Sequence, residues 1–262
     1  MFAKPIVFVV GAGASFELGF PLGLSLRKSI AADLTFRFDP LNQTSGSREL
    51  ANLIRMTHPG DTNAYFEAAH LLSPAMEPFP SVDEALHHFA GNERVIQLGK
   101  LAIAMRIIGA ERTSTLPPEQ DHEAVAKFSW QTGWWLAEFL SMALSGTTLK
   151  DNRRLFENVT IVDFNYDRSP EHFLVHALLR NAARDEESAK EALLNLKILR
   201  PYGSIGPLPW QQKKREGVPY GELRVGSPNI GGAAANIRTF TEQNVDDQMR
   251  KDISSALDNA QA

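Results

Sequence analysis

The stretch Pro5-Ile-Val-Phe-Val-Val-Gly-Ala-Gly-Ala-Ser15 decides the fold. Ile6 to Val10 is a continuous run of β-branched and aromatic residues, which predicts a parallel strand covered on both faces. Gly11 and Gly13 follow at once, and glycine permits backbone angles and a close approach that a Cβ would prevent. Ser15 can cap a following helix or donate its hydroxyl to an anion. The stretch therefore predicts a buried strand that leads into a phosphate-sized loop.

The glycine loop alone does not identify a ligand. The full dinucleotide fingerprint has a third glycine where this chain has Phe16. It also expects an acidic residue about 20 residues later, at the end of a second strand. Here Asp33 and Asp39 lie near a helix end and a proline turn. An ordinary dehydrogenase is therefore disfavoured, and a tight strand-to-helix turn without a ligand remains an alternative.

The composition is that of an ordinary soluble globular protein. The 262 residues are 43% hydrophobic and carry a formal net charge of −4, so nothing favours non-specific nucleic-acid binding. No apolar run approaches the roughly 20 residues that span a bilayer, and the first ten residues lack the features of a signal peptide. We therefore predict a cytoplasmic protein that binds neither membranes nor nucleic acid directly.

Cysteine is absent, which excludes disulfides, thiolate catalysis and zinc sites with thiolate ligands. Among the seven histidines, His172 and His176 are spaced to share a helix face. Because the glutamate of the metalloprotease motif is missing between them, we predict no metal site.

Helical patterns fill the middle of the chain. Apolar residues recur at helical spacing over residues 24–34, 49–56, 61–72, 93–109 and 123–145. Ser81-Val-Asp-Glu84 is a capping box that starts a further helix. The aromatic stripe of the last range is expected to pack in the core; its members are Trp130, Trp134, Trp135 and Phe139. These patterns predict an all-helical insertion over residues 45–150.

Strand patterns return after the insertion. Val159 to Phe164 leads into Asn165-Tyr-Asp167, and a helix is predicted from about Pro170. A second strand, Leu196 to Leu199, leads into another glycine loop, Tyr202-Gly-Ser204. We further predict a helix over 186–194, a minor strand over 222–225, a glycine-alanine turn over 230–235 and an amphipathic helix over 243–262. The predicted fold class is α/β: a Rossmann-like parallel sheet, formed by residues 1–44 and 151–262, with a large all-helical insertion.

Three strand-end segments occur in a characteristic order: Gly11 to Ser15, Asp163 to Asp167, and Tyr202 to Ser204. Together they resemble the bacterial sirtuin-like domains associated with anti-phage defence. The resemblance extends to Ser81-Val-Asp-Glu84, to residues 99–104 and to Phe-Asn-Tyr-Asp-Arg at 164–168. It implies that the first loop binds the diphosphate of NAD and that Asn165 acts on the nicotinamide ribose.

Carried over residue by residue, the resemblance assigns two sets of residues. Those that bind NAD would be Gly11, Ala12, Gly13, Ala14, Ser15, Pro21, Asn165, Gly203 and Ser204. Those at catalytic positions would be Asn165, Asp167 and Tyr202.

Two departures from the family bear on function. The chain lacks the four-cysteine zinc module of deacylating sirtuins, which makes protein deacylation improbable. It also has Tyr202 where the family has its catalytic histidine, and tyrosine, with a pKa near 10, is a poor base. His172 or His176 can substitute if the fold brings them in, although we favour a packing role for His172.

Asn165 and Asp167 also have purely structural interpretations, an Asx turn and a helix cap. We favour the cap for Asp167. For Asn165 we favour a functional role, because ligands bind at the carboxyl ends of strands in such sheets.

The sequence thus supports two hypotheses. In the first, the chain is an NAD glycohydrolase that acts in anti-phage defence and releases nicotinamide and ADP-ribose. In the second, it binds NAD or ADP-ribose without consuming it and signals to a partner. In neither case is a metal expected.

The predicted C-terminal helix carries an apolar stripe, Val245, Met249, Ile253 and Leu257. No strand follows it in the chain to cover that stripe. We therefore expect either residues beyond Ala262 or another subunit, in a homo-oligomer or with a partner defence protein, to cover this face.

Overall fold

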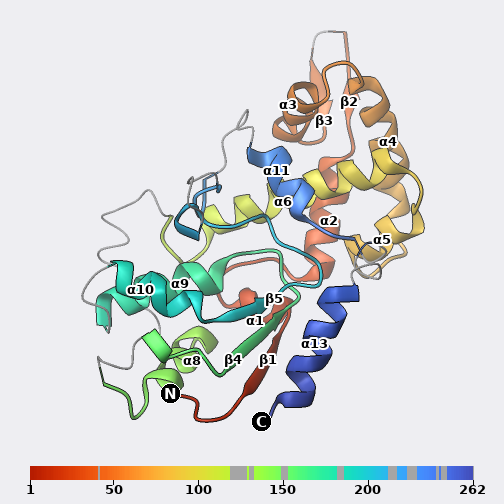
Figure 1. Cartoon of the computed structure of the whole chain (residues 1–262). Helices are drawn as coiled ribbons and strands as arrows, with labels where there is room; N and C mark the ends of the chain where they lie inside the picture. Colours follow the sequence, from red (N-terminus) through yellow and green to blue (C-terminus); the bar gives the residue numbers. More distant parts are fainter. Residues whose placement is uncertain are drawn as a thin grey trace.

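A parallel sheet organises the lower part of the molecule in Figure 1. It has the order β1-β4-β5 and is formed by β1 (Ile6–Val10), β4 (Val159–Asp163) and β5 (Lys197–Leu199). This computed structural model describes residues 1–40, 42–118, 129, 133–148, 153–181, 186–211, 217–222, 229–239, 242 and 247–261. The predicted class is confirmed: the fold is α/β, with a Rossmann-like parallel sheet and a large helical insertion.

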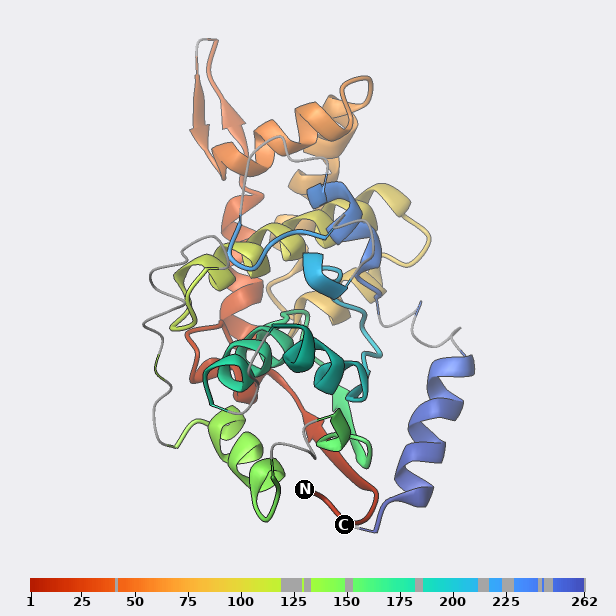
Figure 2. The same cartoon turned by 60° about the vertical axis from the view of Figure 1, so that its left-hand side comes forward.

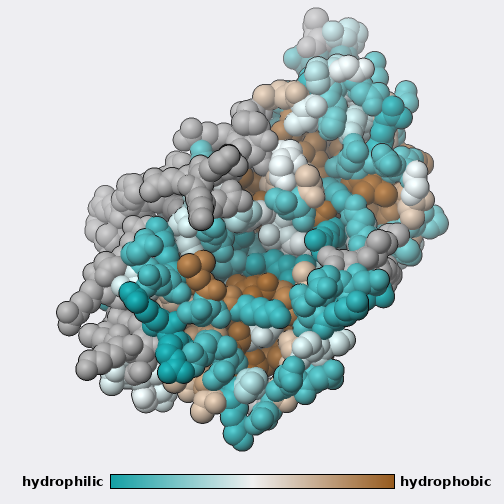
Figure 3. All heavy atoms as spheres, viewed as in Figure 1, coloured by the Kyte–Doolittle hydropathy of each residue, from teal (hydrophilic) through white to brown (hydrophobic). Residues whose placement is uncertain are grey.

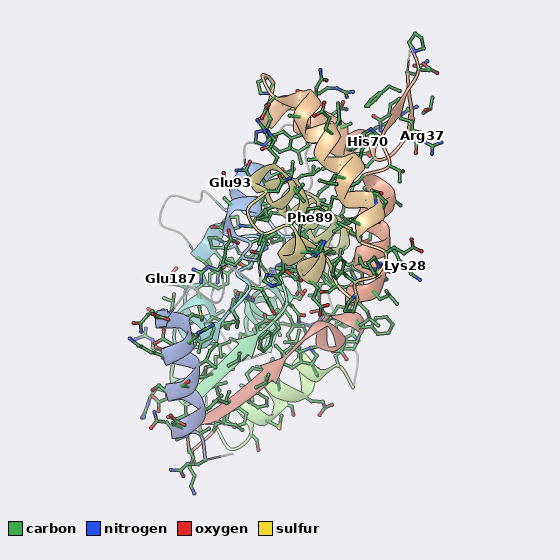
Figure 4. The ribbon with its side chains drawn as sticks, turned by 90° about the vertical axis from the view of Figure 1, so that its right-hand side faces the viewer. Lys28, Arg37, His70, Phe89, Glu93 and Glu187 are labelled. Carbon is green, nitrogen blue, oxygen red and sulfur yellow. The ribbon has the colours of Figure 1, made fainter. Side chains whose placement is uncertain are left out.

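The helices that follow β1 gather in the upper part of the molecule. They are α2 (Gly23–Asp33), α3 (Arg48–Thr57), α4 (Thr62–Ala75), α5 (Val82–His88) and α6 (Glu93–Thr113). α6 lies at their centre in contact with α2, α4 and α5, so it is buried on more than one side, as the sequence predicts. A hairpin that the sequence does not predict, β2 (Arg37–Phe38) with β3 (Gln43–Ser45), projects beyond α4 near the labelled Arg37 and His70 in Figure 4.

The remaining helices surround the sheet or follow it in the chain. They are α1 (Ala12–Phe16), α8 (Trp135–Leu144), α9 (Ser169–Asn181), α10 (Glu186–Leu194), the 3-10 helix η2 (Pro209–Gln211), α11 (Asn229–Asn236) and α13 (Asp247–Asn259). None of the helices in the described ranges is both long and apolar enough to cross a bilayer.

The two faces of β1 differ in burial. Phe8 packs against Phe139 of α8, with ring centroids 5.2 Å apart. Val9 points to the opposite face and is 62% exposed. Apolar residues are visible over the strands in Figure 3. The prediction that β1 is covered on both faces is therefore wrong, because the described residues leave its second face open at Val9.

The long helix predicted over residues 123–145 is also corrected. Gly133 has a φ of 96° and Trp134 is extended, so a continuous helix is interrupted at this point and α8 begins at Trp135. Of the predicted range, residues 123–128 and 130–132 lie outside the described residues. Trp134 and Phe139 are buried in the core, as expected for the aromatic stripe. Trp130 lies outside the described residues.

Two C-terminal predictions have different outcomes. The predicted turn over 230–235 is wrong, because these residues form α11, whose Ile230, Ala233 and Ala234 are buried and which contacts α6. The predicted terminal helix is confirmed as α13 from Asp247, whereas 243–246 lie outside the described residues, as do 223–225 of the predicted minor strand.

α13 packs loosely on the sheet. None of its residues is buried, and Leu257 is 50% exposed. The helix contacts β5, and Gln261 N–H donates to the carbonyl of Pro5 at 2.9 Å. The two chain ends consequently lie close together in both Figure 1 and Figure 2. The covering of its apolar stripe by another chain stays a prediction.

A buried ion pair joins α6 to the segment after β4. The carboxylate of Glu111 accepts from Arg168 Nη2 at 2.5 Å and from Nε at 3.0 Å. Glu111 also accepts from the N–H of Gly221, and Arg168 donates to the carbonyl of Val218. Both charged side chains are essentially inaccessible to water. Each therefore needs the opposite charge of the other to offset the free energy that its burial costs.

We predict that Glu111→Gln lowers the free energy of unfolding by about 3 to 5 kcal/mol, because it leaves the Arg168 guanidinium buried without a carboxylate. Urea unfolding followed by circular dichroism measures this. Glu157→Gln is the control, since it breaks the exposed pair with Arg154 and should leave the midpoint unchanged. Equal midpoints for the two variants would contradict the prediction.

Candidate functional site

The glycine loop and Asn165 meet at one edge of the sheet. β1 and β4 are paired in parallel with Val10 opposite Asp163, so both strands end at the same level. Residues that follow these ends are consequently neighbours, as expected for the ligand-binding edge of such sheets. The next element, α1, begins at once at Ala12, with Gly11 as its N-cap residue.

The glycines of the loop have no strained backbone. Gly11 has a φ of −139°, an extended conformation that any residue adopts. A Cβ added at Gly11 or Gly13 would meet no other heavy atom within 4 Å. The expectation that unusual backbone angles require these glycines is therefore wrong for Gly11. Open space above both α-carbons is compatible with a ligand that approaches the backbone closely.

A chain of hydrogen bonds fixes the orientation of the Asn165 amide. Ser15 Oγ donates to Asp167 Oδ2 at 2.7 Å, because the carboxylate can only accept. The same Oγ then accepts from Asn165 Nδ2 at 3.2 Å, and Nδ2 also donates to the carbonyl of Gly11 at 3.0 Å. Asn165 Oδ1 has no partner among the described residues and is left to accept from a ligand hydroxyl.

This geometry revises one role and supports another. Ser15 does not cap a helix, because it lies inside α1 and its hydroxyl is bonded to Asp167. Asp167 is buried, and its Oδ1 accepts from the N–H of Ser169 at the start of α9, 3.0 Å away. The structural role favoured for Asp167 is thus supported, because it accepts from the first N–H of α9, although Arg168 and not Asp167 immediately precedes the helix; Asp167 also positions Ser15.

The backbone of Asn165 is held by a second carboxylate. Its N–H donates to Asp163 Oδ1 at 2.9 Å, so the Asx turn here is formed by Asp163 and not by Asn165, the residue for which the sequence suggested one. Asp163 Oδ2 accepts from Arg200 Nη2 at 3.0 Å. Burial raises the pKa of Asp163 to about 7, although the Arg200 guanidinium opposes the shift. Both the amide and the backbone of Asn165 are therefore fixed before any ligand binds.

An inner cavity of about 120 Å³ lies beside Asn165. Its lining combines the glycine loop, α2, α5 and the segment after β4; the polar and loop members include Ala12, Ser15, Pro21, Ser81, Asp83, Asn165, Tyr166 and Asp167. Pro21 and Ala12, both assigned to NAD binding, are thus present in the lining. The volume suits a small group rather than a whole nucleotide.

An outer cleft of about 610 Å³ adjoins this cavity and shares Ser81, Asp83 and Phe164 with it. This volume lies within the usual range for ligand sites. Aromatic side chains and ionisable groups line the cleft; they are Phe79, Phe164, Tyr202, Asp83, Glu84, His87 and His88. The cleft is suited to a planar, positively charged ring, which aromatic faces and carboxylates both attract.

Tyr202 lies in the outer cleft beside two carboxylates. Its ring is 5.9 Å from that of Phe164. Burial, and after it the charges of Asp83 and Glu84, raise the pKa of the Tyr202 hydroxyl. Tyr202 is therefore neutral at physiological pH, and it can donate a hydrogen bond but cannot act as a base.

Asp83 is a functional candidate that the sequence motifs do not reveal. Its Oδ1 accepts from the hydroxyl of Tyr166, and burial raises the pKa of the carboxyl group. The predicted helix start at Ser81 is confirmed, because Ser81 is the N-cap residue of α5 and its Oγ accepts from Glu84 N–H at 3.2 Å. The capping-box motif marks the start of a helix, but it does not show which groups the side chain of Asp83 faces.

Three other assigned residues have structural roles. Gly203 has a φ of 69°, and a Cβ there would lie 2.0 Å from the carbonyl oxygen of Asn236. Ser204 Oγ accepts from Gly206 N–H. Ala14 accepts from the indole of Trp135 at 2.9 Å, which ties α1 to α8. None of these three lines either the inner cavity or the outer cleft.

The two histidines on α9 lie away from the site. His172 is buried, its Nε2 is 2.7 Å from the carbonyl oxygen of Pro117, and its ring stacks on Tyr220 with centroids 3.9 Å apart. Burial lowers its pKa well below the usual value. The ring of His176 is 4.5 Å from that of His172. His172 is therefore a packing residue, as favoured, and neither histidine lines the cavity or the cleft.

Comparison with known proteins does not assign the chain to a family. No protein-family model matches it, and neither curated proteins nor solved structures give a significant match.

We predict that Ser15→Ala lowers the free energy of unfolding by about 1 to 3 kcal/mol, because Asp167 and Asn165 both lose a buried partner. Thermal unfolding measures the loss. Ser25→Ala is the matched control, since Ser25 Oγ donates to the carbonyl of Leu22 at an exposed position and its removal should have little effect. A Ser15 variant as stable as the control would show that the chain of bonds is unimportant for the fold.

Proposed function

We propose that the chain binds NAD and hydrolyses its nicotinamide–ribose bond, releasing nicotinamide and ADP-ribose. The observation that carries the proposal is the Asn165 amide, whose Nδ2 is held by Gly11 and Ser15 while Oδ1 faces no protein donor in the described chain. A fixed acceptor at this edge suits a ribose hydroxyl. The resemblance to sirtuin-like domains suggests that such an activity acts in anti-phage defence.

The surroundings of Asn165 fit the other parts of NAD. The open space over Gly11 and Gly13 fits a diphosphate. The outer cleft, with Phe79, Phe164 and its two carboxylates, fits the cationic nicotinamide ring. Cleavage passes through an oxocarbenium-like state, which nearby carboxylates and a preorganised amide stabilise.

We predict that Asn165→Ala lowers the rate of nicotinamide release from NAD by about 100-fold or more, the usual effect of removing one preorganised group. Release is followed by chromatography. The matched control is Asn158→Ala, because Asn158 donates to the carbonyl of Phe2 at the opposite end of β4. Absence of release by the wild-type chain with and without candidate partners, or equal rates for the two variants, would contradict the proposal.

Tyr202 supports a second function, an NAD or ADP-ribose sensor that passes its state to a partner. The hydroxyl stands where the family has its base, and its raised pKa makes it less able to take a proton than ordinary tyrosine. In this case the site binds the nucleotide and leaves it intact.

We predict that Tyr202→His increases nicotinamide release at least tenfold if a base at this position limits turnover, because an imidazole titrates near neutral pH. Calorimetry with NAD, followed by analysis of the nucleotide, separates the functions. Saturable binding with intact NAD supports the sensor, and no binding contradicts both. Tyr202→Phe is the control, which should not raise the rate.

A further inference from the structure

Asp83 occupies the junction of the inner cavity and the outer cleft. It belongs to the lining of both, together with Ser81 and Phe164. The Ser81 cap fixes the first turn of α5, on which Asp83 lies. On one side of the junction is Asn165, and on the other is Tyr202. A carboxylate at this junction can contact a ligand that occupies both the inner cavity and the outer cleft.

The hydrogen bonds of Asp83 leave part of the carboxylate free. Tyr166 donates its hydroxyl to Oδ1. The backbone N–H of Asp83 itself also hydrogen-bonds the carboxylate, and no donor from another residue in the described part of the chain reaches Oδ2. One oxygen is therefore positioned by the protein, and the second can accept a proton from a bound water molecule.

Other groups in the inner cavity are less suited to take a proton. Asp167 already accepts from Ser15 and Ser169. Tyr166 is a neutral donor, because burial raises the pKa of its hydroxyl well above the usual value. Glu84, His87 and His88 line the outer cleft but not the inner cavity.

We propose that Asp83 is the general base of the hydrolytic reaction and takes the place of the absent histidine. This inference rests on the proposed function. In the step, the oxygen of a water molecule forms a bond to C1′ of the ribose while the bond from C1′ to the nicotinamide nitrogen breaks. The electron pair of that bond neutralises the pyridinium ring, and one proton of the water passes to Asp83.

The environment of Asp83 raises the pKa of its carboxyl group above the ordinary value for aspartate, which makes the carboxylate a better base. Burial raises its pKa, the hydrogen bond from Tyr166 opposes that shift, and the charge of Glu84 adds to it. The other ionisable groups around the junction are His87 and His88 on the same helix, and Tyr202 after β5. Because the base must be ionised, activity should fall as the pH decreases through the pKa of Asp83.

The test compares Asp83→Asn with Glu157→Gln, which removes an exposed carboxylate that pairs with Arg154 and lines neither the cavity nor the cleft. Asparagine keeps an oxygen that accepts from Tyr166, so the fold should be retained, and thermal unfolding checks this. We expect Asp83→Asn to lower nicotinamide release by about 100-fold or more, to weaken NAD binding by calorimetry far less than it lowers the rate, and to remove the acidic limb of the pH profile. Glu157→Gln should keep both the rate and the limb.

Rescue by azide separates a base from a structural residue. Azide attacks C1′ without losing a proton, so it should restore nicotinamide release in Asp83→Asn and give ADP-ribosyl azide. An active wild type with an equally active Asp83→Asn, or a slow variant that azide does not rescue, overturns this inference alone. A wild type that releases no nicotinamide overturns the proposed function and this inference with it. If Asp83→Asn does not fold, a wild-type profile without an acidic limb above pH 4 overturns the inference.

Discussion

The parallel pairing of β1 with β4 is the constraint on which the rest of the structure depends. The pairing joins Ile6 to Val159 and Val10 to Asp163 across the helical insertion. The glycine loop and the segment after β4, which are distant in sequence, are therefore adjacent at the carboxyl ends of the two strands. Without this register, Gly11 and Ser15 would not meet Asn165, and the hydrogen bonds that orient its amide could not form.

Buried charge then fixes the surroundings of that edge. Asp163, Arg200 and Glu171 form one group behind Asn165, and Glu111 with Arg168 forms another beside it. Such groups cost free energy to bury, and their geometry must be kept for the charges to compensate. The motif at 164–168 thus has two functions: Asn165 faces the cavity, whereas Asp167 and Arg168 hold the segment in place.

The sequence predicts the parts of the fold that local patterns determine. The strand from Ile6, the helix capped by Ser81 and the central helix α6 all follow from apolar spacing and capping. The sequence does not predict features that depend on contacts with residues distant in the chain. An apolar run does not show whether another layer packs on each face of a strand, so the exposure of Val9 does not follow from the sequence. Likewise, residues 230–235 read as a turn but form a helix because α6 covers them.

The same limit applies to the site. Motif order predicts that Asn165 follows a strand end and that the glycine loop lies near it, but the position of Asp83 depends on how α5 packs against that edge. The two kinds of group have separate origins: the sheet supplies an oriented amide, and the helical insertion supplies a carboxylate next to Tyr166. Because the cavity lies between these elements, any shift of α5 relative to the sheet changes the distance between Asp83 and Asn165. The packing of the insertion on the sheet therefore controls the chemistry that the site can perform.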